Sequence, residues 1–332
     1  MVPDQAATQV NSDGVSGPEV TDVSVIVCSR NRVSQLAETL KSIDSVDVPD
    51  GRAVEVIVID NGSSDGTVDL LKSRPLRRLP FRWKTVSTPG KSRALNAAIQ
   101  LSRGTVLLWT DDDVRVRADW VTKMSQPILD RQFDALAGAV SIPEVLLSRI
   151  RGTSAERRMW MFASTDGIDF GSPQFMLGAN MAFGRHVLAR VPGFDEELGP
   201  GALGYAEDTN FSRRLISAGF SIGGVPDCPV DHHFDVSRLD PATSDAMSAR
   251  LGASLAHVAF RWERRRVRFP RLKLLKAMAS HPVKALSLRL RGTEQDRLED
   301  LRHDHVLWCA YLRRFIAMQR AASAVPAGDS AK

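Results

Sequence analysis

Short apolar runs alternate with amphipathic helical patterns along the first 140 residues of the chain. The runs are rich in β-branched residues and predict buried strands, whereas the segments between them repeat apolar residues three or four positions apart, as helices do. The predicted strands are Val23–Cys28, Val54–Ile59, Phe81–Val86, the apolar part of Thr105–Val114, and Ala135–Val140. The predicted helices are the segment through Leu36, Leu40 and Ile43, then Val68–Ser73, Ser92–Leu101 and Asp119–Asp130. This alternation predicts an α/β fold with a Rossmann-like, mostly parallel sheet flanked by helices.

The second half of the chain is less regular, and its end is helical and basic. The predicted elements there are strands at Met176–Phe183 and Ile222–Val230, helices at Arg185–Val191 and Ala206–Ala218, and a Gly/Pro-rich loop over Gly193–Gly204. We divide the chain into a disordered leader at 1–22, a domain at 23–240 with halves 23–140 and 141–240, a helical basic extension at 241–320, and a disordered tail at 321–332.

Three adjacent carboxylates, Asp111, Asp112 and Asp113, end the apolar run that begins at Thr105. Adjacent carboxylates repel one another, and Asp favours neither a strand nor a dry environment. A divalent cation makes such a cluster tolerable, because hard cations take carboxylate oxygens as ligands. The alternative is a solvated turn that caps the helix beginning near Ala118.

The cysteine content and the distribution of charge bear on the location of the protein and on its partners. The three cysteines are far apart and show neither a disulfide framework nor metal-site spacing, which favours a cytoplasmic location. The net charge of +5 is uneven, because residues 257–291 hold eleven Lys/Arg against one acid. The rest of the chain is mildly acidic, so we expect no nucleic-acid partner.

The polar residues that follow three predicted strands suit a nucleoside diphosphate with a metal ion. They are Ser29, Arg30 and Asn31 after the first strand, Asp60 after the second, and the three aspartates after the fourth. Ligands of open parallel sheets bind beyond the carboxyl ends of the strands, so these groups meet in one crevice if the strands are neighbours. Lys91 or Arg93, at a predicted helix start, would meet phosphate.

The loops of this chain exclude two other classes of nucleotide-binding protein, the dinucleotide-binding dehydrogenases and the P-loop NTPases. The first loop, Cys28–Arg32, holds no glycine, so the backbone cannot approach a pyrophosphate as a dinucleotide-binding turn does. Pro89–Ser92 mimics only the end of a P-loop, and the full P-loop motif is missing from the sequence.

A series of motifs, in order, resembles glycosyltransferase family 2, whose members have the GT-A fold. The motifs are Val23–Arg32, Ile59–Thr67, Gly90–Asn96, Trp109–Asp113, Gly178–Phe183, Gly193–Glu196 and Glu207–Arg213. The resemblance covers roughly Val23–Asp235, about two thirds of the chain. It implies inverting transfer of a sugar from a nucleotide-activated donor, with a nucleotide-binding half at 23–140 and an acceptor half at 141–240.

The resemblance also implies roles for individual residues. Asp208 is similar in position to the family's general base. Asp111 and Asp113 match the family's Asp-x-Asp metal motif for Mn²⁺ or Mg²⁺, with His232 or His233 completing the shell. The expected donor-binding residues are Ser29, Arg30, Asn31, Asp60, Arg93, Asp111 and Asp112. The expected acceptor-binding residues are Gly178, Asn180 and Glu207.

Two departures from the family pattern refine these expectations. Asn61 stands where many relatives carry a second Asp, which leaves the base preference open, although a UDP-sugar is the expected donor. The Gln-x-x-Arg-Trp motif of processive members is missing, since Val258 occupies the Gln position before Arg261 and Trp262. We therefore expect transfer of a single sugar to a glycan or lipid-linked acceptor.

The sequence allows two alternatives to sugar transfer. The chain could be a non-catalytic glycan- or nucleotide-binding or membrane-scaffolding protein on a degenerate transferase fold, although acids at 60, 111, 113 and 208 favour an enzyme. Nucleotidyl transfer to a sugar phosphate normally needs a Gly-rich first loop, which is missing from the sequence.

The basic segment at 257–291 mixes cations with apolar residues at helical spacing, especially over Pro270–Ala279 and Val283–Leu290. A basic amphipathic helix of this kind lies on anionic membranes, which would place the protein at the inner face of the cell membrane. The alternative is a helix packed on the catalytic domain with its charges in water. Leu298–Met318 predicts another helix, which closes the fold or makes a homodimer contact.

Overall fold

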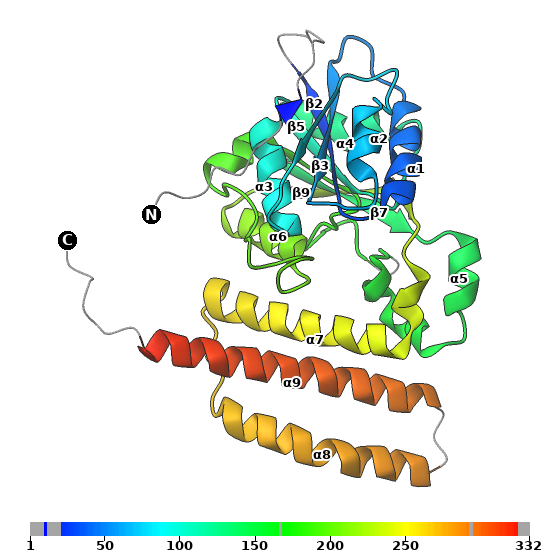
Figure 1. Ribbon diagram of the computed structural model, residues 1–332. Helices are drawn as coiled ribbons and strands as arrows, with labels where there is room; N and C mark the ends of the chain where they lie inside the picture. Colours follow the sequence, from blue (N-terminus) through cyan, green and yellow to red (C-terminus); the bar gives the residue numbers. More distant parts are fainter. Residues whose placement is uncertain (1–9, 12–20, 166–167, 292–294, 325–332) are drawn as a thin grey trace, which may run out of the picture. The chain divides into compact units, whose positions relative to one another are not determined.

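The predicted strands form one sheet in the computed structural model, which describes residues 10–11, 21–165, 168–291 and 295–324 (Figure 1). Within these residues the sheet has nine strands in the order β1-β4-β3-β2-β5-β8-β7-β9-β6. The strands are β1 Val10–Asn11, β2 Val23–Ser29, β3 Val54–Asp60, β4 Phe81–Thr85, β5 Val106–Asp111, β6 Val114–Arg115, β7 Ala135–Ser141, β8 Met181–Gly184 and β9 Ile222–His232.

The sheet is mixed rather than uniformly parallel. Strands β4, β3, β2 and β5 run parallel, as the alternating pattern predicts, and β7 is parallel to β9. Strand β8 is antiparallel to both β5 and β7. The expected strand at Met176–Phe183 begins only at Met181, because the backbone turns where the Asn180 N–H donates to Leu177 O. An antiparallel strand needs no helical crossover, so strand and helix alternation alone does not reveal it.

Helices cover both faces of the sheet. Strand side chains point alternately to the two faces of the sheet, so the sheet contributes apolar residues to two cores, one on each face. One core packs under α1 Val33–Asp44, α2 Thr67–Lys72 and α4 Trp120–Leu129. The other packs under α3 Lys91–Leu101 and α6 Glu207–Ser217, which lie on the opposite side in Figure 1. The predicted α/β architecture with flanking helices is therefore confirmed.

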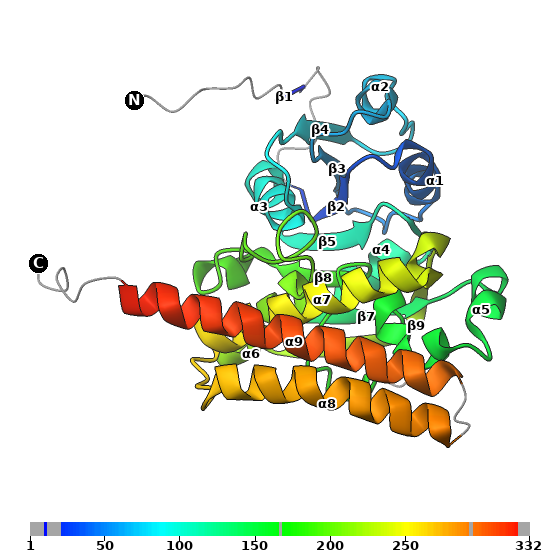
Figure 2. The same cartoon turned by 60° about the horizontal axis from the view of Figure 1, so that its bottom comes forward.

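The Cα positions divide the chain into two compact units. The first holds residues up to 148, with 159–202 and 207–234, and contains the sheet. The second holds 149–158, 203–206 and the residues from 235 onward. Its long helices are α7 Pro241–His257, α8 Pro270–Leu290 and α9 Gln295–Ala324, and both views place α9 between α7 and α8 (Figures 1 and 2). The helix expected at Leu298–Met318 is thus longer, and it buries Leu312 and Phe315.

Short helices complete the described chain. They are α5 Glu144–Ile150, the 3₁₀ segments Ser154–Phe162, Arg185–Ala189 and Val236–Leu239, and a π turn at Val258–Trp262. The helix predicted at Arg185–Val191 is therefore a 3₁₀ helix. None of the helices described is long and apolar enough to cross a bilayer.

Some predicted boundaries need correction. Two residues of the expected leader form β1, which pairs with β4, while most of 1–22 lies outside the described residues. Helix α9 continues to Ala324, so the expected tail at 321–332 begins as helix, and 325–332 lies outside the described residues. Helix α8 runs through Pro282 without interruption.

Helix α1 holds the segment that follows β5. The Thr39 hydroxyl is fully buried and lies 2.7 Å from Asp112 O and 2.8 Å from Val114 O. It also accepts a hydrogen bond from the Arg115 guanidinium at 3.0 Å. The main chain around the adjacent aspartates is therefore fixed by a side chain from another element.

We predict that Thr39→Val lowers the free energy of unfolding by about 1–3 kcal/mol, because buried polar groups lose their partner while the shape is kept. Urea unfolding measures this change. Ser34→Ala, an exposed position on the same helix, is the control and should stay within about 0.5 kcal/mol of the wild type. Equal stability of the two variants would show that Thr39 does not anchor this segment.

Candidate active site

The polar residues predicted to meet at the sheet do gather at one edge. Strands β3, β2 and β5 are neighbours and parallel, and their register pairs Ser29 with Asp60 and Cys28 with Asp111. The carboxyl ends of these strands therefore lie side by side, which brings Asp60 and Asp111 to the same end of the sheet although they are far apart in the sequence. This edge is the place where open α/β sheets bind ligands.

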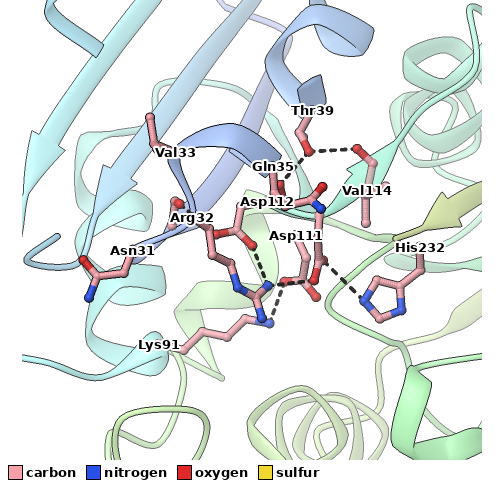
Figure 3. Close-up of polar contacts among 12 residues, drawn as sticks. Asn31, Arg32, Val33, Gln35, Thr39, Lys91, Asp111, Asp112, Val114 and His232 are labelled. Carbon is pink, nitrogen blue, oxygen red and sulfur yellow. Dashed lines mark hydrogen bonds and ion pairs between the residues drawn. The ribbon is translucent and has the colours of Figure 1, made fainter. Parts of the chain in front are cut away.

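Asp112 and Asp113 share one cation, Arg32. Its Nη1 lies 3.0 Å from Asp112 Oδ1 (Figure 3). The same atom lies 2.7 Å from Asp113 Oδ2. The Ser29 hydroxyl donates to Asp112 Oδ2 at 2.7 Å. Burial raises the pKa of Asp112 to about 6, against the opposing effect of Arg32. Burial alone would lower the pKa of Arg32, but the two carboxylates raise it above its usual value.

Sequence reasoning assigned no role to Arg32. The signal was present, since three adjacent acids at the end of a buried strand require a nearby cation. The sequence offered several basic residues close to the strand ends, and it did not show which of them reaches the acids.

Asp111 has a different partner, Lys91 at the start of α3. Lys91 Nζ lies 2.6 Å from Asp111 Oδ1 and 3.4 Å from Glu207 Oε1. Burial would lower the pKa of Lys91, yet Asp111 and Glu207 raise it overall. Burial, with Asp208 nearby, raises the pKa of Glu207 to about 7 despite the opposing charge of Lys91. Lys91 thus joins the acids of the sheet edge to those of α6.

Asp208 lies beside this group, on the first turn of α6. Its Oδ2 accepts a hydrogen bond from the Gly178 N–H at 2.9 Å, and its Oδ1 accepts one from the Thr209 N–H at 2.6 Å. A Cβ on Gly178 would lie 3.2 Å from Lys91 Nζ and 3.7 Å from Asp208 Oδ2. A small cavity is lined by Lys91, Asp111, Gly178, Glu207 and Asp208 among others. Glycine at 178 keeps this space open.

One of the two adjacent histidines faces the acids. His232 is buried, and its Nε2 lies 3.3 Å from Asp113 Oδ1, while its Nδ1 contacts the carbonyl of Phe162. The main-chain N–H of His233 donates a hydrogen bond to Asp113 O at 2.7 Å. Of the two candidates, the geometry favours His232 as a metal ligand.

The donor set of Asp113 and His232 suits a divalent cation, because carboxylate oxygen and imidazole nitrogen are accepted ligands. Among the residues that the structure describes, however, no three His, Cys, Asp or Glu side chains are grouped to hold a metal by themselves. Asp111, expected as a third ligand, is engaged with Lys91. A cation here would need further ligands besides these two side chains.

A family model described as "Glycosyl transferase family 2" matches residues 24–191, about half of the chain. The chain belongs to glycosyltransferase family 2. It is 32% identical over 125 residues to the succinoglycan biosynthesis protein ExoM of Rhizobium meliloti, covering 37% of this chain and 40% of that protein. It is 26% identical over 188 residues to a beta-monoglucosyldiacylglycerol synthase of Trichormus variabilis, covering 53% of this chain and 38% of that enzyme. The chain thus spans about two fifths of the length of these two curated relatives.

A solved structure supports the fold. The mannosyltransferase PcManGT from Pyrobaculum calidifontis, in complex with GDP-Man and Mn²⁺, superposes with a TM-score of 0.60 at 18% identity. The match covers 91% of this chain and 89% of that one. The chain therefore has the GT-A-type architecture that the motif order implied.

Asp60 is fully buried at the end of β3. Its Oδ1 accepts a hydrogen bond from the Ser63 N–H at 3.0 Å, whereas its Oδ2 has no hydrogen-bond partner within the described part of the chain. A buried carboxylate oxygen without a donor is costly. A hydroxyl or N–H of a bound nucleotide would satisfy it.

The hydrogen bonds of Asn61 explain why asparagine stands where many members of the family carry a second aspartate. Its Nδ2 donates to Val86 O at 3.2 Å and to Thr88 O at 3.0 Å, and its Oδ1 accepts from the Gly90 N–H at 2.8 Å. Aspartate has no hydrogens to donate to these carbonyls. In this chain Asn61 links the end of β3 to the segment after β4 and to the start of α3.

Three expected ligand-binding residues have other partners. Asn180, expected to bind an acceptor, is fully buried, and its side-chain amide forms hydrogen bonds with Trp120, Ala139 and Cys228 inside the core. Arg93 Nε lies 3.2 Å from Glu196 and its Nη1 donates to Pro89 O, so Lys91 and not Arg93 reaches the acids. Asn31 is exposed, and its side chain accepts from the Ser64 N–H at 2.7 Å. Arg30 is exposed beside it.

We predict that Glu207→Gln flattens the dependence of stability on pH. The pKa of Glu207 is higher in the folded chain, at about 7, than its usual 4.5, so this residue's contribution to stability falls as the pH rises through that window. Between pH 4.5 and 8 the free energy of unfolding of the wild type should fall by about 1–3 kcal/mol more than that of the variant. Unfolding free energies across this range test the point.

Glu196→Gln is the matched control, because Glu196 is a half-exposed partner of Arg93. It should leave the wild-type profile unchanged. A Glu207→Gln profile parallel to the wild type would contradict the assignment.

Proposed function

We propose that this transferase moves one sugar from a UDP-sugar to a hydroxyl of a glycan or lipid-linked acceptor, with inversion, a divalent cation and Asp208 as general base. The observation that carries the proposal is the arrangement around Gly178. There Asp208, Asp111, Lys91 and Glu207 line one small cavity at the carboxyl edge of the sheet. A base and the charges that would bind a diphosphate thus share one space.

The proposed donor site is the edge formed by β3, β2 and β5. Asp60 Oδ2 would accept a hydrogen bond from the base or ribose, since this buried oxygen has no partner in the described chain. Lys91 and Arg32 supply positive charge beside the acids, where a diphosphate would otherwise meet only carboxylates. The similar mannosyltransferase was solved with GDP-Man and Mn²⁺, which supports a nucleotide-sugar as the donor class.

The proposed cation site is Asp113 with His232, completed by oxygens of the donor. Mn²⁺ or Mg²⁺ bound there would neutralise charge that grows on the departing diphosphate. Arg32, which touches Asp113 Oδ2, would hold that carboxylate in place and offset part of its charge.

Asp208 would take the proton of the acceptor hydroxyl. The Gly178 and Thr209 N–H groups hold its two oxygens, and each carboxylate oxygen keeps further lone-pair capacity for a hydroxyl. As the hydroxyl oxygen attacks the anomeric carbon, its proton passes to Asp208 and the bond to the diphosphate breaks on the opposite side. Glu207, fixed by Lys91, would position the acceptor next to this carboxylate.

We predict that Asp208→Asn lowers turnover by roughly 10²–10⁴-fold while the affinity for nucleotide changes little, because the amide cannot accept the proton. Steady-state transfer assays and calorimetric nucleotide titration measure the two quantities separately. Asp69→Asn, an exposed position on α2, is the control and should keep full turnover. Full activity of Asp208→Asn would remove the general-base role.

We predict that Asp113→Asn reduces the gain in nucleotide affinity that Mn²⁺ gives, by about 10–100-fold. UDP and GDP titrations with Mn²⁺ and with a chelator report the gain, and the melting temperature reports folding. His232→Gln should act in the same direction, whereas His233→Gln should keep the wild-type response. An unchanged Mn²⁺ response in both Asp113→Asn and His232→Gln would place the cation elsewhere.

A further inference from the structure

Helix α8 presents large apolar side chains to solvent along its whole length. None of its residues is buried by the rest of the described chain. Its most exposed apolar side chains are Leu272 at 65%, Leu275 at 64%, Val283 at 68%, Leu286 at 58% and Leu290 at 80%. Isolated exposed leucines are ordinary, but a continuous apolar surface on a soluble domain marks an interaction site.

These side chains form one stripe. Successive members, with Ala279 between Leu275 and Val283, are three or four residues apart, so they share one face of the helix from its first turn to its last. A different face meets α9, where the His281 ring stacks on the His305 ring with centroids 4.1 Å apart. Packing against α9 therefore does not account for the stripe.

Every Lys, Arg, Asp or Glu on α8 is a Lys or an Arg, so the apolar stripe has only positively charged neighbours. Between Arg264 and Arg291 the chain has ten Lys/Arg and no Asp or Glu. Arg271 and Lys276 border the stripe on its two sides in helical projection, and Lys273 and Lys284 lie further round. All four side chains are exposed. The surface thus combines an apolar stripe with positive flanks.

We propose that α8 lies in the interfacial plane of an anionic lipid bilayer, with its apolar stripe among the acyl chains and its cations at the headgroups. This chemistry matches an interfacial helix, whose apolar face enters the headgroup boundary while basic residues meet anionic lipids. The proposal goes beyond sugar transfer, and it stands whether or not the assigned base is correct.

A second copy of the chain fits this surface less well. Two copies packed stripe to stripe about a two-fold axis would bring the cations of one helix against those of the other. The segment has no acid between Arg264 and Arg291 that would relieve this repulsion.

Flotation of the full chain with vesicles tests the proposal. Vesicles of phosphatidylcholine with phosphatidylglycerol should carry the protein, and vesicles of phosphatidylcholine alone should carry much less. The double variant Leu275→Glu/Leu286→Glu should weaken binding more than about tenfold, because charges replace apolar groups in the stripe. Lys273→Gln/Lys276→Gln/Lys284→Gln should weaken it on the order of 100-fold on anionic vesicles.

Val145→Glu, at another apolar residue that is 66% exposed, is the matched control and should bind like the wild type. Equal melting temperatures show that the variants are folded. Three results would overturn the proposal: no flotation of the wild type, wild-type flotation of the Leu275→Glu/Leu286→Glu variant, or a wild-type dimer in ultracentrifugation that this variant dissociates. The last result would assign the stripe to a second copy.

Discussion

The ion pairs of Arg32 and Lys91 make the acidic edge of the sheet possible. Asp112, Asp113 and Glu207 are at most 7% exposed at their side chains, and isolated carboxylates at such burial would neutralise or disrupt the fold. Arg32 bridges two of them, and Lys91 joins Asp111 to Glu207. Removing one partner of such pairs leaves the other charge buried without compensation. The site is therefore a balanced set of charges, and each member depends on the others.

The loops that carry these charges are fixed by neutral hydrogen bonds from other elements. Thr39 of α1 holds the main chain at Asp112 and Val114, and Asn61 ties the end of β4 to Gly90 at the start of α3. These hydrogen bonds fix the main chain beside Lys91 and at the aspartates before any ligand binds. A preorganised site avoids the cost of ordering its charges during the reaction.

The two compact units expose different chemistry. The sheet-bearing unit buries its apolar side chains in two cores and gathers its polar groups at one edge. In the helical unit α9 buries Leu312 and Phe315, whereas no residue of α8 is buried. Helix α8 thus packs one face against α9, whereas no layer of the described chain covers its apolar stripe. An external apolar phase is the physical counterpart of such a face.

The sequence alone indicated seven of the nine strands described, all except β1 and β6, because apolar runs and helical spacing are local patterns. It also indicated the acids at the ends of β3 and β5, since turn residues and charges follow buried strands directly. Motif order identified the family before any geometry was considered. The antiparallel direction of β8 was missed, since direction within a sheet is set by pairing and not by local pattern.

Only the tertiary structure decided which groups meet. Four basic residues lie near the strand ends in the sequence, namely Arg30, Arg32, Lys91 and Arg93. Of these, Arg32 and Lys91 face the acids. Arg93 instead pairs with Glu196, and Arg30 is exposed to solvent. The same holds for His232 over His233, and for Asn180, whose motif suggested an acceptor site but whose amide is used up inside the core. Local sequence fixes which groups a segment carries. The partners of a side chain depend on where segments far apart in the chain are brought together, and packing determines that.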